Sequence, residues 1–180
     1  MPPRAGSLVT LTREPERLLH LSATSADTVT ARLAGQVAQA LDWPGKPRPE
    51  IPPVRPLAPE EQERFTAGEQ LYRAHCAVCH QENGEGLEGV ARSLVGSRWA
   101  LSGPGQAARI VLHGKEGEML MPGLGGTLSD EEIAATLTYV RRSWGNSADP
   151  MTPAQVAEAR GEAGNRRQAW TEEELLRFRW

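Results

Sequence analysis

The chain has 180 residues, of which 39% are hydrophobic and 24% are charged, and its formal net charge is -3. This length suits one domain with extensions, and the composition offers no broad basic surface of the kind that nucleic acid requires. No apolar run approaches the roughly 20 residues that span a bilayer, and the first residues show no signal-peptide pattern.

The first predicted elements are two helices that precede residue 44. A short helical segment covers residues 15–21, and a longer one covers residues 25–43. Apolar residues recur every four positions in the longer segment, at Val29, Leu33, Val37 and Leu41. We assign residues 1–43 as an N-terminal helical extension with two open interpretations. It either packs on the main domain or is the end of a helical array.

Proline marks the next segment. Seven prolines lie between Pro44 and Pro59, and such a stretch cannot maintain a ladder of backbone hydrogen bonds and favours an extended polyproline conformation. Residues 44–59 are therefore predicted to be a Pro-rich linker or a strap on the domain surface.

Clear helix signals follow the linker. Pro59 suits the first turn of a helix that runs to Cys76, and Gly68 within it should allow close crossing with the last helix of the domain. Residues 103–114 predict a short helix that ends at Gly114.

The remaining helices each begin with a capping box, in which Ser or Thr is followed three residues later by Glu or Gln. These boxes start at Ser129, Thr152 and Thr171. The first opens the final helix of the main domain, residues 60–146, and the other two lie in a C-terminal helical tail, residues 147–180. No alternating strand pattern is found, so the expected fold class is all-α.

Cys76 and Cys79, the two cysteines of the chain, are followed directly by His80. A disulfide between them would close a tiny loop and stabilise little, and a thioredoxin-like dithiol needs a preceding strand. Structural zinc needs four ligands. With His75 as the fourth, all four ligands would come from six consecutive residues, which would have to close around the metal within a very short segment. C-x-x-C-H is instead the attachment signature of c-type haem, with both thiols bonded to the ring and His80 on the iron.

Met121 is the predicted second axial ligand of the iron. A thioether or a second imidazole completes six-coordination, and Met121 precedes a proline and a glycine in a loop that has to fold tightly over a flat ring. Met119 lies two residues earlier and is expected to point away. His113, Met151 and a vacant sixth site are also considered for this position.

The stretch from about Glu61 to Asn146 resembles a class I cytochrome c domain. The motifs that carry the resemblance are GEQLYRAHCAVCH, NGEG, RIVLHG, MPG and LSDEEIAATLTYVRRSWGN. TPAQV and AWTEEELL in the tail are similar to endings of cytochrome domains fused to or partnered with periplasmic quinoprotein or sugar dehydrogenases. The resemblance implies the cytochrome c fold with one covalently bound haem c.

The resemblance also implies further cofactor contacts. In this family, prolines are common just before the L-x-G-S stretch. A backbone carbonyl there accepts a hydrogen bond from the histidine that binds the iron. This chain has Arg92 and Ser93 there, so the residue that supplies the carbonyl stays open. Further cofactor-binding candidates are Arg98 and Trp99 near a haem propionate, Leu94 in the pocket wall, and Tyr72.

His and Met ligation leaves no open site for a substrate and suits outer-sphere electron transfer. We expect an electron carrier and no enzyme, with a dehydrogenase as donor and a cytochrome or oxidase as acceptor. The alternatives are the cytochrome module of a larger dehydrogenase and a five-coordinate haem protein that binds gas or peroxide.

The attachment motif resembles substrates of the bacterial periplasmic maturation system, so a periplasmic location is expected, without nucleic-acid partners or a transmembrane segment in this chain. Because no export signal is visible, we expect a mature form, an engineered segment or the C-terminal part of a longer precursor.

Overall fold

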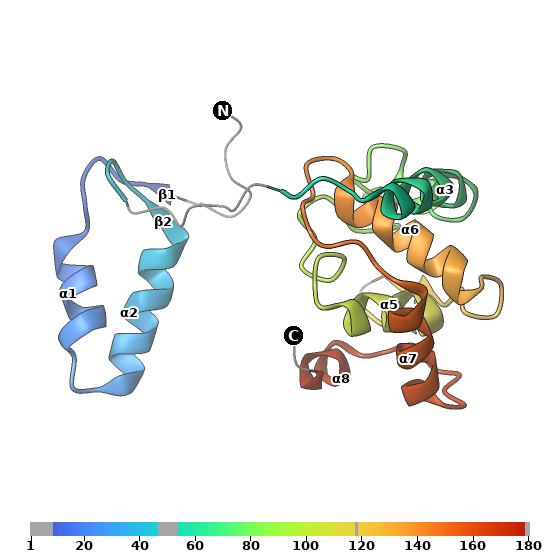
Figure 1. Ribbon diagram of the computed structural model, residues 1–180. Coiled ribbons are helices and arrows are strands. Elements are labelled where there is room, and N and C mark those ends of the chain that lie inside the picture. The colour runs from blue at the N-terminus through green and yellow to red at the C-terminus, as the bar shows by residue number, and fades with distance from the viewer. Residues whose placement is uncertain (1–8, 47–53, 118, 179–180) are drawn as a thin grey trace. The chain divides into compact units, whose positions relative to one another are not determined.

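The computed structural model describes residues 9–46, 54–117 and 119–178, and it divides into two compact units on either side of residue 53 (Figure 1). In the first unit, α1 (Glu16–Thr24) packs against α2 (Thr28–Ala40), and β1 (Val9–Thr10) pairs in parallel with β2 (Leu41–Asp42). Both predicted helices of the extension are confirmed. Residues 47–53 of the predicted linker lie outside the described residues.

The apolar stripe of α2 is not its buried face. Val29, Leu33 and Val37 are each about half exposed, whereas Ala34 and Ala38 are buried. Each alanine follows a stripe residue by one position, so the buried face is rotated around the helix axis relative to the predicted stripe. Both interpretations of the extension remain predictions.

The second unit contains the remaining helices and one short strand pair. Its elements are α3 (Pro59–His75), α4 (Ala77–His80), α5 (Pro104–His113), β3 (Gly114–Lys115), β4 (Met121–Pro122), α6 (Asp130–Arg142), α7 (Pro153–Ala163) and α8 (Glu172–Arg177). The helices over 58–76, 103–114 and 129–144 are therefore confirmed. None of the helices in the described part of the chain is long and apolar enough to cross a membrane.

Helices α3 and α6 cross closely, as the sequence predicted from Gly68 (Figure 1). A Cβ atom at Gly68 would lie 2.0 Å from the backbone oxygen of Ala135, so only glycine fits at the crossing. Beside it, the Tyr139 ring packs against the rings of Phe65 and Tyr72, with centroids 5.2 and 5.3 Å apart. The crossing thereby fixes the end of α3, where the cysteine motif begins.

Residues 54–58 of the predicted linker behave as a strap on this unit. Arg55 forms an ion pair of 2.6 Å with Glu61 in the first turn of α3, and Arg142 at the end of α6 donates a hydrogen bond to the Arg55 carbonyl. These contacts connect the segment before α3 to the α3–α6 pair.

The C-terminal tail packs into the same core rather than extending from it. Helix α7 contacts α5 and α6, and Met151 and Val156 are fully buried in a cluster with Ile133 of α6. Arg160 of α7 donates hydrogen bonds to the carbonyls of Gly125 and Leu128. The second compact unit thus includes the tail.

We predict that Gly68→Ala destabilises the second unit by about 1–3 kcal/mol, because the new methyl group overlaps backbone that cannot move freely. Gly161→Ala in α7 is the matched control: a methyl group there would meet nothing within 4 Å, and a helical Gly→Ala change should be neutral or stabilise by up to about 1 kcal/mol. Urea denaturation, monitored by circular dichroism, measures the free energy of unfolding of both variants. Equal stability of the two variants would contradict the close crossing.

Candidate cofactor site

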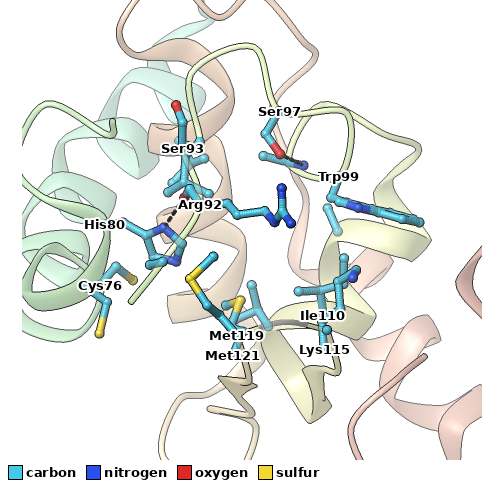
Figure 2. Close-up of a pocket in the computed structure, with 18 of the residues that line it drawn as sticks. Cys76, His80, Arg92, Ser93, Ser97, Trp99, Ile110, Lys115, Met119 and Met121 are labelled. Carbon is cyan, nitrogen blue, oxygen red and sulfur yellow. Dashed lines mark hydrogen bonds between the residues drawn. The ribbon is translucent and has the colours of Figure 1, made fainter. Parts of the chain in front are cut away.

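A cavity of about 810 Å³ lies where α4, α5 and the 119–122 segment converge (Figure 2). Its volume falls within the ~300–1,000 Å³ of typical cofactor sites. Among the residues that line it are most of those predicted from the sequence, namely Cys76, Cys79, His80, Leu94, Arg98, Trp99 and Met121. The structure therefore brings together side chains from separate stretches of the chain.

The cysteine motif enters the cavity through a single helical turn. At the end of α3, the backbone N–H of Cys76 donates a hydrogen bond to the carbonyl of Tyr72. The chain then turns into α4, where the backbone amides of Cys79 and His80 donate to the Cys76 carbonyl over 3.1 and 2.9 Å. Both thiols are free. Burial raises the pKa of Cys76 to about 11, so this thiol is protonated at neutral pH.

The described residues contain no group of three or more His, Cys, Asp or Glu side chains able to hold a metal ion. His75 is the last residue of α3, and it is absent from the residues that line the cavity. This arrangement disfavours the four-ligand zinc interpretation of the motif.

His80 is oriented by the backbone of the following loop. Its Nδ1 lies 3.0 Å from the carbonyl oxygen of Arg92 (Figure 2), so Nδ1 carries the proton and Nε2 keeps its lone pair. Burial lowers the pKa of His80 while the bond to Arg92 raises it, and burial has the larger effect. The imidazole is neutral at pH 7 and can act as a ligand. Arg92 therefore supplies the carbonyl whose residue the sequence did not determine.

Gly86 allows the loop to place this carbonyl. Its φ is +77°, and a Cβ atom there would lie 2.3 Å from the Ala91 oxygen and 2.7 Å from the Arg92 carbonyl carbon. The Gly86 amide also donates to the carbonyl of His80 over 3.0 Å. The NGEG motif thus brings two backbone segments together behind the histidine.

Met119 and Met121 both line the cavity (Figure 2). Leu120 between them is 66% exposed. The expectation that Met119 points away is therefore wrong, because side chains two residues apart in an extended segment share a face. Met121 is the better anchored of the two. It lies in β4, opposite Lys115 of β3, and packs against two core clusters, one of which contains Ile110.

His113 and Met151, also considered as axial ligands, lie away from the cavity. The ring of His113 packs edge-on against Trp170, with centroids 6.2 Å apart, and Met151 is fully buried in the α5–α7 core. Tyr72, predicted to bind the cofactor, lies behind the cavity wall instead. It is fully buried, and its hydroxyl donates to the Gln81 carbonyl over 2.5 Å. Its aromatic ring is needed in the α3–α6 crossing, which holds it away from the cavity.

One edge of the cavity is positively charged. The Arg98 guanidinium and the Lys115 ammonium lie 4.7 and 5.3 Å from the centre of the Trp99 ring. Glu172 of α8 also lines this edge. Sequence reasoning found Arg98 and Trp99 but missed Lys115 and Glu172. Glu172 lies within the AWTEEELL stretch, which gave no sign of a role at the cavity.

Residues 63–140 match the family model of cytochrome c oxidase, cbb3-type, subunit III. Over 91 residues the chain is 31% identical to the cytochrome c subunit of a quinone alcohol dehydrogenase from Gluconobacter oxydans, covering 46% of this chain and 19% of that protein. Over 126 residues it is 29% identical to cytochrome c-552 of Thermus thermophilus, covering 61% of this chain and 95% of that protein.

Among solved structures, the c-type cytochrome XoxG from Methylobacterium extorquens AM1 is 22% identical, with 61% of this chain and 58% of that one covered and a TM-score of 0.35.

The matched part of the chain is a c-type cytochrome domain with the cytochrome c fold. Its cofactor is covalently bound haem c, as in this family. The cavity fits this cofactor, because two thiols, a neutral imidazole and a thioether meet within one space walled by apolar side chains. The match covers only about a fifth of the length of the dehydrogenase subunits.

We predict that Cys76→Ala with Cys79→Ala abolishes covalent haem and leaves the domain largely unfolded, because the ring supplies much of the apolar core of a small domain. Haem staining of a denaturing gel and far-ultraviolet circular dichroism measure both effects. His75→Ala, just outside the motif, is the control and should retain attached haem. A double variant with native helicity and no haem would refute the importance of the ring for folding.

Proposed function

We propose that this chain is an electron-transfer cytochrome in which Cys76 and Cys79 attach one haem c, and His80 and Met121 are its axial ligands. One observation carries the proposal: a neutral His80, oriented by the Arg92 carbonyl, shares the cavity with the anchored Met121 (Figure 2). Two protein ligands would leave no open site for a substrate.

The haem, when bound, supplies the one-electron redox chemistry. The protein holds it through the two cysteines and keeps the imidazole of His80 in one tautomer through the Arg92 carbonyl. Leu94, Ile110 and Val140 line the cavity with apolar surface, which limits the access of water to the iron.

The redox partner is proposed to dock around the cavity mouth. Val78, between the two cysteines, is 78% exposed, and Leu120, between the two methionines, is 66% exposed. Such apolar residues suit the core of a small, transient interface. By analogy with the dehydrogenase cytochrome subunits, we propose a dehydrogenase as the donor, a cytochrome or an oxidase as the acceptor, and a periplasmic location.

The second candidate is a cytochrome module within a larger dehydrogenase. It is favoured by the separate N-terminal unit and by the partial coverage of the matched subunits. Co-purification of a dehydrogenase in stoichiometric amounts would support the module, whereas a free cytochrome that exchanges partners would support the carrier.

We predict that Met121→Ala removes the far-red charge-transfer band of the ferric protein, lowers its reduction potential and opens the iron to carbon monoxide. Visible spectra, redox titration and carbon monoxide binding measure these changes. Met119→Ala is the matched control on the same face of the segment, and it should leave all three nearly unchanged.

Ligand loss in Met119→Ala alone would assign the axial position to Met119. If neither variant changes the spectrum, and the wild-type protein already binds carbon monoxide, the five-coordinate alternative replaces electron transfer.

A further inference from the structure

The C-terminal tail forms one edge of the haem cavity. The backbone of Trp170 pairs with that of the β3 segment. The Trp170 N–H donates to the Gly114 carbonyl over 3.0 Å, and the Trp170 carbonyl accepts from the Glu116 N–H over 2.8 Å. The Trp170 side chain is buried beside Ile110 and the fully buried Leu175. The start of α8 is therefore fixed relative to the cavity by backbone pairing and by core packing.

This docking brings the Glu172 carboxylate to the two cations at the cavity edge. Glu172 forms an ion pair with Arg98, and its other oxygen lies 3.9 Å from Nζ of Lys115. Both cations lie over the Trp99 ring. All four side chains line the cavity, so the carboxylate restricts where the two positive charges can go.

We propose that Glu172 is a positioning residue of the haem site: it holds Arg98 and Lys115 at the ring edge and lowers the reduction potential of the iron. The proposal rests on the proposed function. A carboxylate near the haem favours the oxidised state, which carries one more positive charge than the reduced state. It also offsets the two cations, whose positive charge favours reduction.

The neighbouring Glu173 provides a matched control. It lies in the same first turn of α8, but its carboxylate pairs with Arg177 one turn later over 2.6 Å, and its side chain is 82% exposed. Glu→Gln at either position removes one negative charge from the same helix while keeping the side-chain shape. A difference between the two variants therefore reports the local contacts of Glu172 rather than the net charge of the chain.

The experiment measures the midpoint potential of the haem-loaded full chain by spectroelectrochemistry, at low and high salt. Glu172→Gln should raise the potential, with a smaller shift at high salt because the groups are partly exposed. Glu173→Gln should match the wild type. An unchanged or lowered potential in Glu172→Gln, or an equal shift in both variants, would overturn the proposal.

Lys115→Gln is a second, opposite test that keeps Glu172 in place. Removal of this cation should lower the potential, and the double variant with Glu172→Gln should return toward the wild-type value. Hydrogen exchange of the Glu116 and Trp170 amides checks that the tail stays docked in each variant. If Lys115→Gln leaves the potential unchanged while both amides stay protected, this edge has no influence on the iron and the proposal is wrong.

The two proposals fail in distinguishable ways. A wild-type chain without covalent haem, or with an iron that binds carbon monoxide freely, contradicts the proposed function. A normal wild-type redox couple, with equal potentials in wild type, Glu172→Gln and Glu173→Gln, overturns only the role of Glu172.

Discussion

The close crossing of α3 and α6 at Gly68 is the contact on which the geometry of the second unit depends. Because no side chain separates the helices there, the aromatic rings beside the crossing interlock and the end of α3 has one position. The cysteine motif starts at that end. A covalently attached ring needs both thiols and the imidazole in a fixed relation, and the crossing fixes the end of α3 from which the motif starts.

Loop segments complete the site, and backbone groups hold them. The Arg92 carbonyl orients His80, and amides in the loop after β4 donate to the carbonyls of Val111 and Leu112 at the end of α5. These hydrogen bonds do not depend on side-chain identity. A chain can therefore replace the prolines common in the family by Arg92 and Ser93 and still present a carbonyl at the required place.

The tail connects a local site to the rest of the unit. Some of the matched relatives are dehydrogenase subunits several times longer than the matched region. In this chain α7 completes the core and α8 supplies an acidic side chain next to two cations. The segment that follows the cytochrome core thus sets part of the electrostatic environment of the cavity edge in this chain.

The sequence by itself determined the helices, their caps and the attachment motif, because each of these depends on residues within one or two turns of one another. The prediction from sequence was wrong about the direction of Met119, which lines the cavity. Only the tertiary structure decided that Arg92 supplies the carbonyl and that Lys115 and Glu172 meet, since these contacts join residues that are far apart in the chain. No single sequence pattern joins the charges of the cavity edge, because they come from a loop, a short strand and a tail helix.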